Sequence, residues 1–333
     1  MTGWGERLDA LPRLSLIDQP TPLHAAPNLS AALGGPGIWF KRDDLIPAAF
    51  GGNKVRALDL IVADAVRQGA DTLVTGAGIL SNHVRATSAL ATRQGLSCVG
   101  VYWGAPPPRA EGNHRLARLL GAAIRFTHDD DRASVDAGIE RVASDIRASG
   151  GNPYVIPRGG ACPLAVLAHA RAVRETLAQC AALGVSPTCV VMAVGGSATL
   201  AGWLLGGALF SAPWRIEAFT VSRPASEAAA RARRLATDAA ALIGAPFALG
   251  EGAFRVHDGF IGRGYGVPSR EGRQAIEATA RAEAIFLDPI YTGKAMAGYC
   301  ALCARGEYAD VQDVLFLHTG GAPALFTSCG EEA

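Results

Sequence analysis

Short apolar segments alternate with longer segments of helical periodicity along most of this chain. The clearest apolar segment covers residues 188–194, whose sequence TCVVMAV has no alternation of apolar and polar positions. A strand of this composition is buried on both faces, as the strands of parallel sheets are. Strands that alternate with helices build parallel sheets with helices on both faces. The pattern therefore predicts an α/β fold.

The expected elements follow one another in a regular order. We predict strands at 37–42, 72–75, 97–103, 124–127, 154–157, 188–194, 215–221 and 314–317. We predict helices between them at 54–68, 81–94, 111–120, 135–149, 163–182, 225–243 and 269–284. With 333 residues the chain exceeds a usual single domain, so two lobes that share a cleft are expected.

One lysine stands out at the start of the first long helix. Lys54 follows Gly51, Gly52 and Asn53. An amine acts as a covalent catalyst only where a pocket keeps it uncharged beside a carbonyl group. Glycines before it let the backbone approach a ligand closely. Taken alone, the stretch also fits a turn followed by an ordinary solvated lysine, but we select Lys54 as the candidate reactive amine.

Four further motifs suit the same chemistry. Residues 195–199, GGSAT, follow the buried strand and precede a helix, so their N–H groups and the helix dipole can bind a phosphate. A plain strand-to-helix turn has the same pattern. Residues 80–85, LSNHVR, open another helix, where a serine or asparagine can also act as a cap. The other two motifs are DPIYTGK at 288–294 and HTGGAP at 318–323.

Together these five motifs resemble the fold-type II pyridoxal-phosphate enzymes, and most closely the family of D-cysteine desulfhydrase and 1-aminocyclopropane-1-carboxylate (ACC) deaminase. The resemblance runs from about residue 20 to residue 326. It implies a two-lobe α/β fold like that of the tryptophan synthase β-subunit, with parallel-rich, twisted sheets flanked by helices. The smaller lobe would span 50–165 and the larger, cofactor-binding lobe 1–49 plus 166–333, with the active site between them. The resemblance also implies a homodimer.

The resemblance assigns roles to individual residues. Lys54 would hold pyridoxal phosphate as a Schiff base and act as the base that takes the α-proton. The other implied cofactor-binding residues are Asn82 at the phenolic oxygen, Gly195, Gly196, Ser197, Ala198 and Thr199 at the phosphate, and Thr292 and Thr319 near the pyridine nitrogen. The implied substrate-binding residues are Ser81, His83, Tyr265 and Tyr291. Of these four, Ser81 and the two tyrosines are also catalytic candidates.

Thr292 bears most directly on the reaction. The ACC deaminases of the family carry a glutamate at this position, whereas the D-cysteine desulfhydrases carry a threonine. A neutral hydroxyl leaves the ring nitrogen largely unprotonated and makes the cofactor a weaker electron sink. This suits β-elimination better than the opening of a cyclopropane. The sequence therefore predicts a lyase that converts a small amino acid to a keto acid and ammonia, as a D-cysteine desulfhydrase does.

Several positions depart from the family pattern. Leu80 replaces a usual glutamine, and His169 replaces a tyrosine. Ala161 and Cys162 stand in a loop that usually reads GGSN. Arginines also stand where smaller or neutral residues are expected, at Arg158 and Arg263.

These departures keep other functions open. A guanidinium binds oxyanions through paired hydrogen bonds, so a sulfonate substrate such as cysteate is one alternative. Surface placement of either arginine fits equally well. The remaining alternatives are an ACC deaminase, a β-replacement enzyme for a non-standard amino acid, and a non-catalytic binder of the cofactor or of amino acids.

Composition argues against several other classes. The formal net charge of +1 gives no basic excess for nucleic acid or an anionic membrane. Residues 1–6 lack the pattern of a signal peptide, and the apolar stretches fall short of the ~20 residues that span a bilayer. Seven cysteines favour reduced thiols, hence a cytoplasmic enzyme. We interpret the CxxC spacing of Cys300 and Cys303 as buried helix cysteines, and we predict no metal site.

Overall fold

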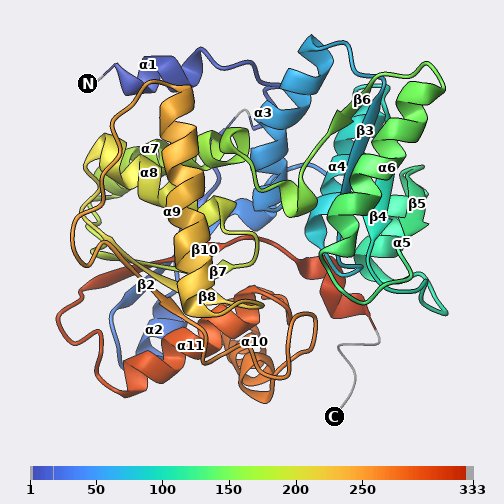
Figure 1. Ribbon diagram of the computed structural model, residues 1–333. Coiled ribbons are helices and arrows are strands. Elements are labelled where there is room, and N and C mark those ends of the chain that lie inside the picture. The colour runs from blue at the N-terminus through green and yellow to red at the C-terminus, as the bar shows by residue number, and fades with distance from the viewer. Residues whose placement is uncertain (1–2, 18, 328–333) are drawn as a thin grey trace.

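Two sheets form the framework of the computed structural model, which describes residues 3–17 and 19–327 (Figure 1). In these residues the larger sheet has six strands, in the order β1 (Leu23–Ala25), β2 (Gly37–Arg42), β10 (Asp313–His318), β7 (Cys189–Val194), β8 (Arg215–Thr220) and β9 (Phe254–His257). The smaller sheet has four, in the order β5 (Ala123–Phe126), β4 (Ser97–Tyr102), β3 (Thr72–Ala77) and β6 (Pro153–Val155). Only β1 pairs antiparallel to its neighbour among these described strands, which confirms the predicted parallel-rich α/β fold.

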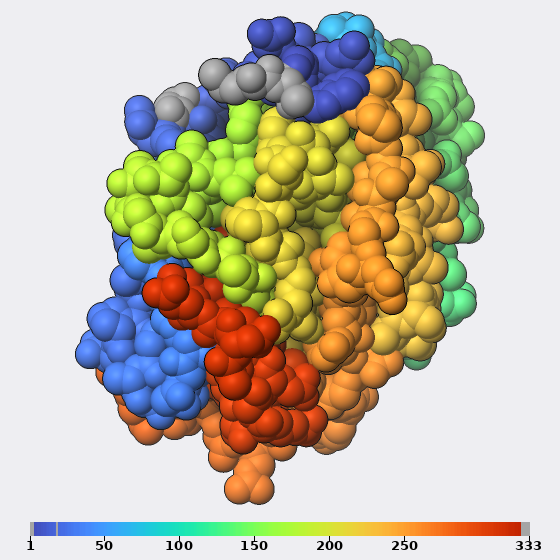
Figure 2. Space-filling view, turned by 90° about the vertical axis from the view of Figure 1, so that its left-hand side faces the viewer, coloured from blue at the N-terminus to red at the C-terminus, as the bar shows by residue number. Residues whose placement is uncertain are grey.

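Helices cover both faces of the larger sheet. One face carries α7 (Pro163–Leu183), α8 (Ala198–Phe210) and α9 (Ala225–Leu242). The opposite face carries α2 (Pro27–Leu33), α10 (Arg270–Glu283) and α11 (Thr292–Ala304). Figure 2 shows the yellow-green and yellow surface of the α7 and α8 region beside the orange surface of later residues.

The central strand β7 explains why its sequence lacks a polar face. Val190 and Met192 point into the core shared with α7, α8 and α9. Cys189 and Val191 point into the opposite core, shared with α2 and α11. Because successive side chains of a strand alternate between faces, a strand between two helical layers must be apolar throughout.

The smaller sheet is also covered on both faces. Its helices are α4 (Asn82–Arg93), α5 (Gly112–Leu119) and α6 (Ser134–Ala148). Val135 and Ile139 of α6 pack on Val74 and Val101 of the sheet. The remaining described elements are α1 (Trp4–Asp9), α3 (Asn53–Arg67), η1 (Asp43–Leu45), η2 (Arg158–Gly160) and η3 (Ala322–Phe326).

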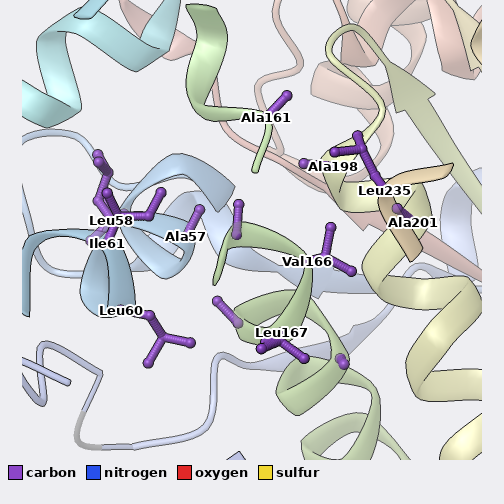
Figure 3. Packing of buried hydrophobic residues seen from close by; sticks show 14 of the residues in the cluster. Ala57, Leu58, Leu60, Ile61, Ala161, Val166, Leu167, Ala198, Ala201 and Leu235 are labelled. Atoms are coloured by element: carbon purple, nitrogen blue, oxygen red, sulfur yellow. The ribbon is translucent and has the colours of Figure 1, made fainter. Parts of the chain in front are cut away.

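Helix α3 joins the two parts of the molecule. Its apolar face contributes Leu58 and Ile61 to the same core as Val166 and Leu167 of α7 (Figure 3). It also packs against α4, which covers the smaller sheet. The C-terminal segment passes from β10 to η3, which contacts α5 beside the smaller sheet (Figure 1).

The predicted strands and helices are present, and their ends lie within two residues of the predicted ones. The sequence analysis missed α1, α2, β1 and β9, because short elements give too few residues for a period. The strands of the smaller sheet all lie within 50–165, while the lobe boundary itself stays a prediction. Cys300 and Cys303 are partly buried free thiols in α11. Within the described residues, no helix combines the length and apolar composition required to cross a membrane.

Candidate active site

A cleft lies where strands of both sheets end. Ala77 ends β3, Val194 ends β7, and Thr319 follows β10, and all three line the cleft. Ligands of open α/β sheets bind at the carboxyl ends of the strands, so this is the expected place for a site. The predicted site residues that line it are Lys54, Ser81, Asn82, Gly195, Gly196, Ser197, Ala198, Thr199, Tyr265, Tyr291 and Thr319.

The turn before α3 places Lys54 in this cleft. Gly51 and Gly52 both have positive φ angles, of 61° and 103°. A Cβ on Gly51 would lie 2.2 Å from the carbonyl oxygen of Asp44, so only glycine allows this close approach. The Lys54 Nζ donates a hydrogen bond of 2.7 Å to the Gly159 carbonyl oxygen. Burial lowers the pKa of Lys54 to about 8, which favours the uncharged amine that a covalent catalyst needs.

The start of α8 lies in the same cleft as this lysine and is suited to an anion. Ser197 has a φ of 69°, and no side chain caps the helix, because the Ser197 hydroxyl donates to the Ala228 carbonyl oxygen instead. The first amide groups of a helix lack partners within the helix, and here they line the cleft. Thr199 is fixed by a 2.8 Å hydrogen bond from Asn53 Nδ2. The site therefore fits a phosphate, as predicted from the motif.

Two residues, Arg85 and Asn113, determine which end of the Asn82 amide faces the cleft. Arg85 is fully buried and donates through Nε to Asn113 Oδ1 at 2.8 Å. Asn113 Nδ2 in turn donates to Asn82 Oδ1 at 3.0 Å. Since Arg85 can only donate, this chain of hydrogen bonds leaves Asn82 Nδ2 as the donor that faces the cleft. A donor at that position suits an oxyanion such as a phenolate.

Ser81 and His83, which open α4, have different surroundings. Ser81 lines the cleft, and its Oγ accepts a 3.1 Å hydrogen bond from the His83 amide, as an N-cap. The His83 ring does not line the cleft. It is buried beneath Gly160 and bonds through Nε2 to the Thr75 hydroxyl at 2.9 Å. The structure thus does not bring the His83 side chain to the position predicted for a substrate contact.

Tyr265 and Tyr291 form a pair at the opposite wall. Their hydroxyl oxygens are 2.7 Å apart. Burial raises the pKa of Tyr265 to about 12 and raises that of Tyr291 further above its ordinary value. Both phenols therefore keep their protons at neutral pH. Lys294 holds the loop before Tyr265, since its Nζ donates to the carbonyl oxygens of Ile261 at 2.7 Å and Gly264 at 3.0 Å.

The two threonines predicted near the pyridine nitrogen are placed differently. Thr319 lines the cleft, and its carbonyl oxygen accepts the Asn53 amide. Thr292 is fully buried and does not line the cleft. Its hydroxyl donates to Asp288 Oδ1 at 2.7 Å and accepts from the Asp288 amide at 2.8 Å. Because a hydroxyl has one hydrogen, Thr292 must release Asp288 before it can donate to a ring nitrogen.

The structure also shows where the residues that depart from the family pattern lie. Arg158 lines the cleft, whereas Arg263 is exposed and does not. Cys162 is the N-cap residue of α7 and the buried Ala161 precedes it, close in the chain to the Gly159 carbonyl that holds Lys54. His169 is buried and contacts the Thr199 hydroxyl at 3.2 Å, behind the phosphate site. Leu80 lines a neighbouring pocket with Ile79, Pro107, Pro108, Arg109, Glu111, His114 and Thr327.

The sequence analysis missed four cleft residues with large aromatic or basic side chains. They are Trp103, Arg132, Arg223 and Arg231, which come from separate loops and from α9. No local pattern in the sequence distinguishes them, because the fold alone brings these distant segments together.

The chain resembles known proteins over nearly its whole length. It matches the family described as pyridoxal-phosphate dependent enzyme over residues 14–320. It is 40% identical to a D-cysteine desulfhydrase of Salmonella choleraesuis and 39% identical to one of Salmonella typhi, in each case over 96% of this chain and 97% of the other. A solved ACC deaminase homologue shares 32% identity and a TM-score of 0.90, over 98% of this chain and 97% of that one.

More distant structures share the fold alone. A fungal L-serine ammonia-lyase from Rhizomucor miehei is 18% identical with a TM-score of 0.63, over 93% of this chain and 95% of that one. The cleft itself fits pyridoxal phosphate, because it combines a buried amine of lowered pKa with an uncapped helix start. The predicted family, fold class and cofactor are confirmed. The chain belongs to the pyridoxal-phosphate dependent enzymes, and among their fold-type II members to the D-cysteine desulfhydrase and ACC deaminase family.

Proposed function

We propose that this enzyme is a lyase that removes the β-substituent and the amino group of a small amino acid, with D-cysteine as the type of substrate. The products are then pyruvate, ammonia and sulfide. The observation that carries the proposal is the position of Lys54, a buried amine that lines the same cleft as the anion site and the tyrosine pair. The D-cysteine desulfhydrases that it resembles support the leaving group.

The residues at the start of α4 and α8 hold the reactants in this proposal. The amide groups of Ser197, Ala198 and Thr199 would hold the cofactor phosphate, and Asn82 Nδ2 would donate to the phenolic oxygen. The Ser81 hydroxyl already accepts the His83 amide, so its own hydrogen is available to the substrate carboxylate. When bound, pyridoxal phosphate accepts the electron pair that remains on the α-carbon after its proton leaves.

Lys54 and the tyrosine pair move the protons. Lys54 Nζ takes the α-proton, which its lowered pKa permits near neutral pH. One phenol of the Tyr265 and Tyr291 pair donates its proton to the departing sulfur. The hydrogen bond from the second phenol stabilises the charge that forms on the first. The rings of Trp103 and Tyr265, 5.8 Å apart, form part of the cleft wall beside this pair.

Replacement of Lys54 by alanine tests this function. We expect the purified protein to release pyruvate and sulfide from D-cysteine and to show the visible absorbance band of a protonated pyridoxal-phosphate imine. The Lys54→Ala variant should lose both. An unchanged absorbance in the variant would refute the role of Lys54. Release of 2-oxobutanoate from ACC would instead establish the alternative deaminase activity.

We further propose a lobe division at 50–165, a cytoplasmic location and a homodimer. The strands of the smaller sheet lie between residues 72 and 155, which supports this division. The six described cysteines are all free, which suits a reducing compartment. Leu45 and Phe50 are large apolar side chains near the turn that precedes Lys54, and they are 48% and 62% exposed. Exposed apolar side chains of this kind suit a surface that a second subunit covers. Analytical ultracentrifugation tests the dimer, and a single monomeric species would overturn it.

A further inference from the structure

The charge of the cleft wall is unusually one-sided. Among its described lining residues there are five basic side chains and no aspartate or glutamate. Besides Lys54, the basic residues are Arg132, Arg158, Arg223 and Arg231. A wall of one sign raises the local concentration of ligands of the opposite sign. A zwitterionic substrate such as cysteine does not by itself require such a wall.

Arg231 is accounted for by the cofactor. Its Nε donates to the Gly196 carbonyl oxygen at 3.1 Å, so its guanidinium lies against the loop that binds the phosphate. A phosphate group carries about −1.5 to −2 charges at neutral pH. Arg231 and the amides of α8 are therefore the natural partners of that charge. Three arginines remain, and we name Arg132, Arg158 and Arg223 the arginine rim.

The arginine rim joins the two sides of the cleft. Arg132 precedes α6 beside the smaller sheet, and both its Nη atoms lie 3.3 Å from the carbonyl oxygen of Ser222, which follows β8 of the larger sheet. Arg158 Nη1 donates to the Arg132 carbonyl oxygen. Arg223 is next to Ser222 in the chain. All three side chains line the cleft, and Arg223 lies close enough to Arg132 and Arg158 for their charges to act on it.

The existing partners of the arginine rim neutralise its charge only in part. Arg158 pairs with Asp136 at 3.0 Å, and Arg223 with Glu227 at 3.2 Å. These carboxylates are 54% and 57% exposed, so water screens both pairs in part. Within the described part of the chain, Arg132 has no carboxylate within 4.0 Å. Burial, and the neighbouring Arg132, Arg231 and Arg158, lower the pKa of Arg223.

We propose that the arginine rim binds an oxyanion at the far end of the substrate, so that the enzyme accepts amino acids whose β-substituent is a sulfonate. This inference rests on the proposed function, because the same Lys54 and cofactor perform the elimination. The α-proton passes to Lys54, and the bond between the β-carbon and sulfur breaks. Its electron pair leaves with the sulfur as sulfite. Water then hydrolyses the remaining 2-aminoacrylate to pyruvate and ammonia, with no oxidant or reductant.

The position of Arg158 makes it the most informative residue. It immediately precedes Gly159, whose carbonyl oxygen holds Lys54 Nζ at 2.7 Å. A planar guanidinium can bind two oxygens of a sulfonate at once, whereas a lysine ammonium acts as a point charge. As sulfite leaves, negative charge also develops at the far end of the substrate, away from the α-carbon. Stabilisation of that charge by the arginine rim would accelerate the elimination itself.

Equilibrium binding of 3-sulfopropanoate provides a test that does not depend on turnover. This compound has the carboxylate and sulfonate of cysteate but no amino group, so it cannot react with the cofactor. We expect calorimetry on the holoenzyme to detect binding that weakens with salt. Arg132→Gln and Arg158→Gln should each weaken it roughly tenfold or more, as expected for a lost charged hydrogen bond. Arg158→Lys should weaken it less.

Arg263→Gln is the matched control, because it removes the same charge from an exposed position outside the cleft. It should leave 3-sulfopropanoate binding unchanged. Turnover supplies a second readout, in which both enantiomers of cysteate are compared with D-cysteine. We expect wild-type enzyme to release sulfite from one enantiomer. In Arg158→Gln, the ratio of kcat/KM for cysteate to that for D-cysteine should fall roughly tenfold.

The outcomes separate this inference from the proposed function. Sulfide from D-cysteine, without either 3-sulfopropanoate binding or sulfite release, would overturn the inference and leave the lyase intact. If Arg263→Gln weakened 3-sulfopropanoate binding equally, that would also overturn the inference, because a charge outside the cleft would then have the same effect. Absence of keto acid from every amino acid, together with an absorbance that does not depend on Lys54, would overturn the proposed function instead.

Discussion

At the scale of single residues, burial determines the chemistry of Lys54. The pKa of its amine is about 8, whereas an exposed lysine has a pKa near 10.4. The amine must be neutral to attack the aldehyde of pyridoxal phosphate. The neutral fraction rises as the pH rises through the pKa, so a lowered pKa moves this rise toward neutral pH.

Cofactor uptake by the apoenzyme should follow this titration. We expect the rate of uptake, followed by the visible absorbance of the imine, to increase between about pH 7 and 9 and then level off. Its midpoint should lie near 8. Free lysine methyl ester, measured in parallel, controls for the pH dependence of the aldehyde itself. A midpoint near that of an exposed lysine would show that the cleft does not lower the pKa of Lys54.

The amide orientation of Asn82 yields a second prediction at this scale. Asn113→Asp keeps the acceptor for Arg85 but removes the donor to Asn82. The Asn82 side chain is then free to turn its carbonyl toward the cleft, where it repels the phenolic oxygen of the cofactor. We expect the dissociation constant of the cofactor to rise roughly tenfold, as for the loss of one charged hydrogen bond. The absorbance maximum should also shift. The matched control is Asn152→Asp at an exposed position. It should alter neither the dissociation constant nor the absorbance maximum.

Single residues also mark the limit of the sequence analysis. The whole motif at 195–199 lines the cleft, together with Ser81 and Asn82 of the motif at 80–85 and Thr319 of the motif at 318–323, because each motif follows a predicted strand. The His83 ring does not line it, since Thr75 and Gly160 on other segments determine its direction. The Thr292 hydroxyl is likewise directed by Asp288, four residues earlier in the chain. Sequence patterns located these positions but not the orientation of their side chains.

At the scale of elements, Lys294 attaches α11 to the loop that carries Tyr265. Its ammonium group is fully buried and donates to two carbonyl oxygens of that loop, those of Ile261 and Gly264. Gly262, Gly264 and Gly266 all have positive φ angles, so the loop has little intrinsic preference for one shape. The lysine therefore helps to hold Tyr265 against Tyr291.

Lys294→Met should loosen this loop. The change leaves two carbonyl oxygens without their charged donor, so we expect the free energy of unfolding to fall by roughly 2–4 kcal/mol. Amide hydrogen exchange over residues 258–268 should accelerate. We also expect kcat to fall more than KM rises, because the Tyr265 hydroxyl is no longer held against Tyr291. Cys300→Ala, on the same helix, controls for a general loosening of α11. Unchanged exchange in Lys294→Met would exclude this role.

At the scale of the whole molecule, a buried ionic network joins segments that are distant in the chain. Arg56 of α3 pairs with Asp43 of η1 at 2.7 Å and with Glu175 of α7 at 3.0 Å. Lys41 of β2 pairs with Glu175 as well. Arg56 lies two residues along α3 from Lys54, so the network anchors the helix that carries Lys54. The sequence analysis did not find it, because charged residues on separate elements give no common pattern.

Removal of Arg56 should destabilise the molecule in a pH-dependent way. Burial alone would raise the pKa of Asp43 and of Glu175, but the charges of Arg56 and Lys41 and their hydrogen bonds together outweigh it, and both pKa values lie below their ordinary range. A carboxylate with a depressed pKa in the folded state stabilises that state above its unfolded pKa, and this contribution is lost as the pH falls through the folded pKa. The wild-type Tm should therefore decline below about pH 4, near the unfolded pKa values of these groups.

Arg56→Met leaves Asp43 buried without its main partner, so we expect a loss of about 3–5 kcal/mol at pH 7. The loss should shrink as the pH falls toward 4, because Asp43 then takes up a proton and no longer needs a cation. Thermal unfolding of both proteins between pH 4 and 8 measures this difference. Arg67→Met, which removes an exposed pair on the same helix, should cost little at any pH. A loss that stays constant with pH would mean that Arg56 acts through packing rather than through its charge.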